Sequence, residues 1–391
     1  MSMHPAEGTF LFFLADESVL FHEPAQKLFC LNTTATFIWC MLEEGKNRQV
    51  MAAELKATFS LTKVEAAGYL EQTETLLKAF GVLKGFEKTL KSEAEITAED
   101  PPIVAYDNMI FVAERRYRLL SSHICMRYSH VDQLALIDPV LGHLHDEQPA
   151  EPTVTFDIIN GQDGRILLCR DQSPVLSCDE YIRLAPLAKS LVWQVAIHAH
   201  DFFLNIHAGV VSDGKQCYLF PAAPGSGKST LTAALVHHGF EYFSDEVALL
   251  HAEGLFVEPV PLALCVKNTG MEVLSRYYPQ LRELSVHLRS DGKRVRYLPP
   301  PAQSVPPAKT RRTVAAIIFP HYLPEQTTTL VPIGSMEALR LLMHQCLIVD
   351  TRLDIDKVAG LLTWIEKIPC YCLTVSDLDE AVTLLQELTR E

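Results

Sequence analysis

The sequence lacks the features that would place it in or across a membrane. No run approaches the roughly 18–20 uncharged apolar residues of a membrane-spanning helix. The opening residues, MSMHPAEGTFLFFLADE, contain no basic stretch and soon reach acidic side chains, unlike a secretory signal peptide. We therefore expect a cytoplasmic protein with no membrane partner.

The sequence also has too little positive charge for a general nucleic-acid binder. Its 34 Lys and Arg residues stand against 48 Asp and Glu residues, which gives a net charge of -14. Proteins that bind the phosphate backbone generally carry a basic surface, and anionic membranes repel acidic ones. This balance predicts no nucleic-acid partner.

Closely spaced cysteine pairs are almost absent. The ten cysteines are scattered, no CxxC pair occurs, and only Cys370 and Cys372 lie close in sequence. This spacing predicts reduced, mostly buried thiols and no structural metal site. The chain is nevertheless long enough, at 391 residues with 48% hydrophobic content, for two or three domains with buried cores.

The most informative stretch is CYLFPAAPGSGKST, residues Cys217–Thr230, which predicts an apolar strand, a glycine-containing loop and a helix start. Such loops bind the phosphates of a nucleotide such as ATP or GTP through backbone N–H groups. The alternative is an ordinary turn before a helix, since Ala222 occupies the position of the first glycine of the usual motif. The predicted nucleotide contacts are Ala223, Pro224, Gly225, Ser226, Gly227, Lys228, Ser229 and Thr230.

Acidic residues and a histidine lie near this loop in sequence. The predicted strand Glu241–Phe243 leads into Asp245 and Glu246, which could bind Mg²⁺ with Ser229 or accept a hydroxyl proton. The alternative is a solvated acidic turn. His207 lies in the predicted strand Phe202–Val211, where it could face the phosphates, hydrogen-bond Asp245, or serve only a structural role.

Three basic residues further along the chain are candidates for phosphate binding. Lys267 follows an apolar strand, and Arg294 and Arg296 belong to the basic segment DGKRVRY. Cations at these positions could bind a nucleotide or an anionic substrate, or lie on the solvated surface.

The pattern along the chain predicts a multidomain α+β or α/β protein. Residues 1–85 read as three strands followed by three helices, a winged-helix-like order in which Asn32 and Thr62 cap the first and third helices and Gly81 ends the third. Residues 86–102 read as a charged linker. Residues 103–180 form a β-rich lead-in of uncertain role. Residues 181–391 contain the phosphate loop, which we expect a hairpin to enter, and a buried strand over Val314–Pro320.

The segment from IHAGVV through PAAPGSGKST to FSDEVALL resembles the HPr kinase/phosphorylase group, in particular its HprK-related kinase A branch. The resemblance covers roughly residues 180–350. It implies a phosphoenolpyruvate-carboxykinase-like P-loop core, phosphorylation of a Ser or Thr hydroxyl, Asp245 as general base, and possible homo-oligomers. The sequence departs from the family at Glu246, where an aspartate is usual, and at Ala222.

The first domain resembles PqqD, the recognition element for ribosomally made, modified peptides. The likeness is carried by the stretch from LNTTATFIWCMLEEGKN to LLKAFGVL, within residues 31–83. PqqD-like domains add a peptide as a strand to their small sheet, against the third helix. The alternative for three strands and three helices is a winged helix that binds DNA.

The two resemblances together predict a kinase that phosphorylates a peptide or small protein held by residues 1–85. A peptide-binding module tethered to a kinase raises the local substrate concentration. Three alternatives remain open: a nucleotide-binding peptide chaperone or NTPase, a small-molecule kinase acting on a substrate such as serine, and a DNA-binding regulator.

Overall fold

The computed structural model describes residues 4–15, 17–86, 109–146, 150–161, 163–200, 202–223, 225–345, 347–348 and 352–390. The chain divides into two compact units, each described by itself. Unit 1 comprises residues 1–97, 333–343 and 349–368, and unit 2 comprises residues 98–332, 344–348 and 369–391. Most residues of the predicted linker 86–102 lie outside the described residues.

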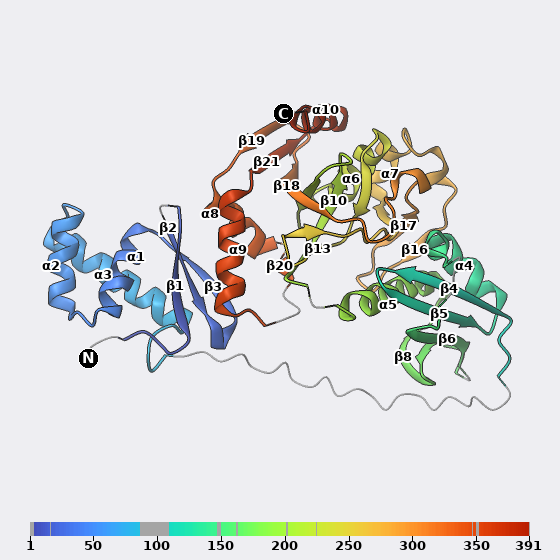
Figure 1. The fold of residues 1–391 in the computed structure, drawn as a ribbon, viewed down its shortest axis with the longest axis horizontal. Coiled ribbons are helices and arrows are strands. Elements are labelled where there is room, and N and C mark those ends of the chain that lie inside the picture. Colours follow the sequence, from blue (N-terminus) through green and yellow to red (C-terminus); the bar gives the residue numbers. More distant parts are fainter. Residues whose placement is uncertain are drawn as a thin grey trace. The chain divides into compact units, whose positions relative to one another are not determined.

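The N-terminal part of unit 1 consists of three strands followed by three helices, as the sequence predicts (Figure 1). The strands pair antiparallel in the order β1-β2-β3. Their bounds and those of the helices are β1 (Thr9–Leu14), β2 (Glu17–His22), β3 (Lys27–Leu31), α1 (Thr33–Glu43), α2 (Arg48–Thr58) and α3 (Lys63–Phe80).

Side-chain caps fix where these helices begin. The Asn32 side chain accepts from the Ala35 amide, and Asn47 caps α2 in the same way. Thr62 and Glu65 form a reciprocal capping box at the start of α3, and Gly81 ends that helix at a φ of 77°. The two predicted caps, Asn32 and Thr62, and the predicted end at Gly81 are confirmed.

The sheet of unit 1 is covered on both faces. Leu20 packs with the helices α1–α3, whereas Val19 and Phe21 point to the other side and are also fully buried. On that other side α9 (Ile355–Lys367) packs against β1 (Figure 1). Arg340 of α8 (Ser335–Gln345) forms an ion pair with Glu17 there.

The boundaries of the first domain therefore differ from the expected 1–85. Gln26 binds the backbone of Leu353 twice, through Leu353 N to Oε1 at 2.6 Å and from Nε2 to Leu353 O at 3.0 Å. Most of segment 333–368, which the sequence-based division assigned to a domain of residues 181–391, belongs to unit 1. The reason is that the outer face of the small sheet is apolar and is buried by packing against this later segment of the chain.

Unit 2 is built on a ten-stranded sheet, of which eight strands have the order β12-β10-β11-β18-β14-β13-β9-β20. The other two strands branch from this row: β21 pairs with β18, and β19 pairs with β21. The strand bounds are β9 (Leu204–Ile206), β10 (Ala208–Ser212), β11 (Cys217–Pro221), β12 (Glu241–Ser244), β13 (Ala248–Leu250), β14 (Phe256–Val257), β18 (Arg312–Tyr322), β19 (Thr329–Pro332), β20 (Leu347–Ile348) and β21 (Cys370–Val375). Helices α6 (Lys228–His237) and α10 (Leu378–Leu388) pack against each other in this unit.

The lead-in region forms a second sheet within the same unit. Strands β4 to β8 pair in chain order, with α4 (Val131–Leu141) and α5 (Leu184–His198) packed together. The core of this layer continues without a break into Val247, Leu262 and Tyr297, which follow in the second half of the chain. The strand bounds are β4 (Ala113–Leu119), β5 (Ser122–Tyr128), β6 (Val154–Asn160), β7 (Ile166–Arg170) and β8 (Ser173–Cys178). Residue 180 is thus no boundary between compact units.

A third, small sheet has the order β15-β17-β16. Its strands are β15 (Leu264–Lys267), β16 (His287–Leu288) and β17 (Arg294–Leu298), and α7 (Asn268–Leu274) follows β15 directly. Cys265 and Tyr297 on one face join the core shared with the lead-in, while Val266 and Leu298 on the other join the core around α6.

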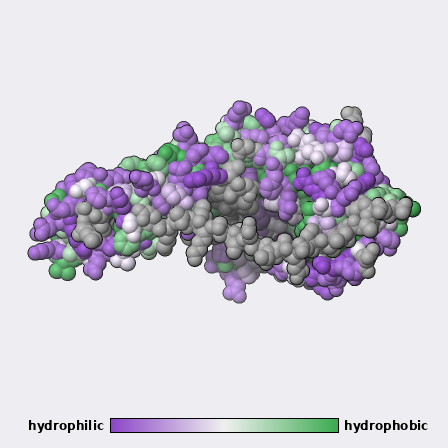
Figure 2. Space-filling model, turned by 90° about the horizontal axis from the view of Figure 1, so that it is seen from below, coloured by the Kyte–Doolittle hydropathy of each residue, from purple (hydrophilic) through white to green (hydrophobic). Residues whose placement is uncertain are grey.

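The surface seen in Figure 2 is mostly hydrophilic, with apolar residues in small separate patches. Within the described ranges, no helix combines the length and apolar composition that a membrane span requires.

The strand predicted over Phe202–Val211 is in fact two strands. β9 pairs with β13 and β20 on one side of the sheet, whereas β10 pairs with β11 and β12 on the other. The single residue between them is His207, at which the chain crosses from one set of neighbours to the other. The expected hairpin into the loop that precedes α6 is confirmed, because β10 and β11 pair antiparallel from Ser212↔Cys217 onward.

A glycine lets the helix after the loop approach β10 closely. A Cβ at Gly209 would lie 2.4 Å from Thr232 Oγ1 and 3.3 Å from Lys228 Cγ. A side chain at residue 209 would therefore clash with the side chains on the inner face of α6, and glycine avoids this clash.

We predict that Gly209→Ala lowers the free energy of unfolding by about 1–3 kcal/mol, because it overpacks the contact between β10 and α6. Urea unfolding of unit 2 measures the change. Gly142→Ala is the control in the same unit, since its Cβ would make only ordinary contacts at 3.6 Å. Adding Thr232→Ala to Gly209→Ala should restore part of the loss, and no recovery would contradict this explanation.

Candidate functional site

The loop between β11 and α6 adopts the backbone that its glycines permit. Gly225 and Gly227 have φ angles of 102° and 90°, a region that side chains disfavour. Ala222 is buried and is not among the described residues with positive φ, so a glycine is not needed there. The structure thus accounts for the departure from the usual motif. Pro224 lies outside the described residues.

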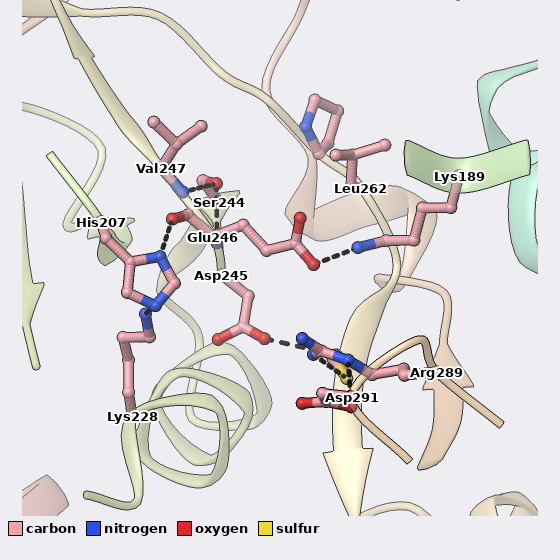
Figure 3. Close-up of polar contacts among 12 residues, drawn as sticks. Lys189, His207, Lys228, Ser244, Asp245, Glu246, Val247, Leu262, Arg289 and Asp291 are labelled. Atoms are coloured by element: carbon pink, nitrogen blue, oxygen red, sulfur yellow. Dashed lines mark hydrogen bonds and ion pairs between the residues drawn. The ribbon is translucent and has the colours of Figure 1, made fainter. Parts of the chain in front are cut away.

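Lys228 begins α6 and is held by His207. Its Nζ lies 2.7 Å from His207 Nε2, while His207 Nδ1 lies 2.8 Å from the carbonyl oxygen of Glu246 (Figure 3). Burial and the charge of Lys228 lower the pKa of His207 to about 4. Because a carbonyl only accepts, Nδ1 carries the proton and Nε2 accepts from the lysine ammonium.

Asp245 is the most buried acid of the site. It is 3% exposed, its Oδ2 accepts from the Cys265 amide at 3.3 Å, and its Oδ1 has no hydrogen-bond partner among the described residues. Burial, together with Glu246, raises the pKa of Asp245 to about 6, although Lys228, Ser229 and the Cys265 amide oppose this. The carboxylate therefore has an unused, buried oxygen next to a lysine.

Glu246 points away from Asp245, as Figure 3 shows. Its carboxylate accepts a hydrogen bond from Lys189 Nζ of α5, and its backbone amide donates to Ser244 Oγ at 3.2 Å. Burial alone would raise the pKa of Glu246, but Lys189, Arg289 and Lys228 outweigh it and lower the pKa. Neighbouring acids in the sequence thus have different partners.

Arg289 adds a further cation at the edge of the site (Figure 3). Its Nη1 lies 3.5 Å from Cys265 Sγ and its Nε lies 3.5 Å from Asp291, while its carbonyl oxygen accepts from Arg183. The positive charge of Arg289 contributes to the lowered pKa values of Glu246 and His207. Arg289 is therefore part of the electrostatic environment of the site.

The structure brings together one group of predicted residues and separates another. His207, Lys228, Asp245 and Glu246 form one connected cluster. Arg294 and Arg296 lie on the face of β17 shared with Val266, whereas Lys267 pairs with Val295 and lies on the opposite face. Arg296 Nε also donates to Leu284 O at 2.9 Å. These three cations therefore do not converge on one point of the small sheet.

Two buried oxygens of the site are free to bind a ligand or a metal ion. Ser226 Oγ and Asp245 Oδ1 are both buried without a hydrogen-bond partner among the described residues, and buried polar atoms normally have one. No described group of three His, Cys, Asp or Glu side chains could hold a metal alone. Mg²⁺ in phosphate sites needs only one or two protein oxygens, however, and Ser229 and Asp245 supply these better than Glu246, which Lys189 engages.

Two residues of the cluster, Lys189 and Arg289, were not identified from the sequence. Lys189 could have been found as a single charge on an otherwise apolar helix face, since Ala185, Ala188 and Val192 around it are buried. Arg289 carries no such signal, because it lies in an irregular stretch rich in charge.

Comparisons with known proteins give little further information. No protein-family model matches the chain, and no curated protein matches it. Among solved structures, the chain is similar to TbiB1 in complex with the TbiA(beta) leader peptide, at 24% identity and a TM-score of 0.21. That match covers 22% of this chain and 99% of the TbiB1 chain.

We predict that Glu246→Gln lowers the free energy of unfolding by about 3 kcal/mol, because it leaves the Lys189 ammonium buried without its carboxylate. Chemical denaturation of unit 2 measures the loss. Glu114→Gln is the matched control, because the Glu114–Arg116 pair is exposed and contributes about 1 kcal/mol or less. Equal effects of the two substitutions would show that the buried charge of Lys189 does not depend on Glu246 for its compensation.

Proposed function

We propose that the chain is a nucleotide-dependent kinase that transfers the γ-phosphate of ATP or GTP to a Ser or Thr hydroxyl. The observation that carries the proposal is Asp245, a buried carboxylate with one unbonded oxygen, next to Lys228 and a glycine loop. A general base must be ionised at the working pH and still basic, and a pKa of about 6 meets both needs.

Each residue of the cluster has a role in this reaction. Lys228 and the loop amides bind the phosphates, and His207 fixes the lysine by accepting its hydrogen bond. Asp245 accepts the proton of the acceptor hydroxyl. Ser229 would hold Mg²⁺, which would supply charge neutralisation for the transferred group, and this leaves Asp245 Oδ1 for the hydroxyl proton.

We further propose that the acceptor is a peptide or small protein bound by unit 1. β3 pairs only with β2 in the described sheet, so its outer edge can accept an added strand. On α3, a shallow open groove that this helix alone lines contains Gly68, Gln72 and Leu76. These residues recur at every fourth position of α3, so they lie on one face of the helix. The next residue in this row is Phe80, whose ring centre lies 4.2 Å from that of Phe29 in β3.

We predict that Asp245→Asn abolishes phosphate transfer while nucleotide affinity changes less than about threefold, because the amide cannot accept the hydroxyl proton. Transfer is measured with γ-³²P-labelled ATP and a Ser/Thr-containing peptide library, and affinity with a fluorescent ATP analogue.

Asp213→Asn is the matched control for Asp245→Asn. Asp213 Oδ1 accepts from the amides of Lys215 and Gln216 in the hairpin turn, and asparagine keeps that acceptor. Wild-type turnover by Asp245→Asn would refute its role as the base. The destination of the label tests the rest: label on peptide supports the proposal, label only in free phosphate indicates an NTPase, and label on added serine indicates a small-molecule kinase.

A truncation of residues 1–85 does not test the peptide site cleanly. Val358, Leu361 and Trp364 of α9 are buried, and α9 packs against β1, so the truncation would expose them. A point substitution in the groove of α3 avoids this problem.

We predict that Gly68→Leu raises the KM for peptide about tenfold, because the side chain fills the groove along α3, and leaves nucleotide affinity unchanged. Ala57→Leu on the exposed face of α2 is the control, since it adds the same side chain outside the groove. Peptide titrations of the transfer rate give the KM. An unchanged KM in Gly68→Leu would exclude this face of α3 as the docking site.

A further inference from the structure

Lys189 is a buried cation that α5 brings from the lead-in part of unit 2. It is 3% exposed, and most of its neighbours on α5 are buried apolar residues. A buried ammonium is costly unless it is paired, and its charged partner in the structure is the carboxylate of Glu246. The nucleotide loop, its helix and the strand that precedes the acids do not contribute this charge.

The partner of Lys189 is itself fixed at its backbone. Glu246 N donates to Ser244 Oγ, and Glu246 O lies 2.8 Å from His207 Nδ1. The bond from Lys189 adds a third point of attachment through the side chain. Glu246 is therefore held on three sides, and Asp245 is the residue immediately before it.

Lys189 also contacts the strand pair that holds Asp245 from the other side. Its Nζ lies 5.3 Å from the centre of the Tyr297 ring, within the range of a cation–π contact. Tyr297 pairs in register with Cys265, whose amide donates to Asp245 Oδ2 at 3.3 Å. The Lys189 ammonium thus contacts both Glu246, the residue that follows Asp245, and Tyr297, the strand partner of Cys265.

We infer that Lys189 is a positioning residue for Asp245, and that the lead-in layer of unit 2 is part of the phosphotransfer site. Lys189 does not contact the reacting atoms. It holds the Glu246 side chain away from the phosphate loop and fixes the orientation of Asp245 through Glu246 and Tyr297. This inference rests on the proposed kinase function.

A purely structural salt bridge makes a different prediction from a positioning role. Lys189→Met alone would leave the Glu246 carboxylate without its partner and would lower both stability and transfer. Its effect on transfer could then not be separated from its effect on stability. The informative protein is therefore the double variant Lys189→Met/Glu246→Gln, which removes both charges and keeps side chains of similar size.

In the full-length double variant, we expect a melting temperature within a few degrees of wild type, a kcat at least 30-fold lower, and a nucleotide KM changed less than threefold. The matched control is Arg127→Met/Asp157→Asn. It removes another ion pair of the lead-in layer, in which Asp157 is buried, and should leave kcat near wild type. Recovery of kcat together with stability in the Lys189 double variant would overturn the inference.

Hydrogen exchange gives a readout that does not depend on activity. With ¹⁵N-cysteine labelling, the Cys265 amide reports its bond to Asp245, and its exchange should accelerate at least tenfold in the double variant. Unchanged protection would overturn the positioning role even if the wild-type protein transfers no phosphate. Absence of transfer by the wild type, with accelerated exchange in the variant, would instead refute the kinase function and keep the positioning role.

Discussion

The site depends on the close contact between α6 and β10, which exists because residue 209 has no side chain. That contact sets where α6 begins relative to the sheet, and so it sets the position of Lys228. The break between β9 and β10 then places His207 within hydrogen-bond distance of that lysine. A loop with the same sequence on a helix held further away would leave Lys228 without this partner.

Charge compensation is the second requirement of the site. Asp245 is buried and the adjacent Glu246 is partly buried, and two ionised carboxylates in such a place repel each other. The structure separates them by giving each its own surroundings: Glu246 turns to Lys189, and Asp245 stays between Lys228 and the Cys265 amide. As a result one acid has a lowered pKa and the other a raised pKa, which is the usual basis for different chemical roles.

The elements with strong local signals were predictable from the sequence, and contacts between distant segments were not. The helix caps Asn32 and Thr62, the hairpin before the phosphate loop and the strands before Asp245 and in β18 appear as expected, because each depends on nearby residues. The break at His207 between β9 and β10 was not predicted. An apolar run in the sequence does not reveal which strands each half of it will pair with. Lys189 and the cover formed by α8 and α9 were missed for the same reason, since both depend on tertiary contacts.

The position of α9 in the chain also has a consequence for folding during synthesis. The outer face of the β1–β3 sheet, with Val19 and Phe21, is made within the first 31 residues, but its cover includes residues 355–367. On the ribosome that apolar face must wait for more than 300 further residues to be translated, which takes tens of seconds at about 5–20 residues per second. During this interval the nascent sheet exposes the apolar side chains of Val19 and Phe21, which the finished protein buries.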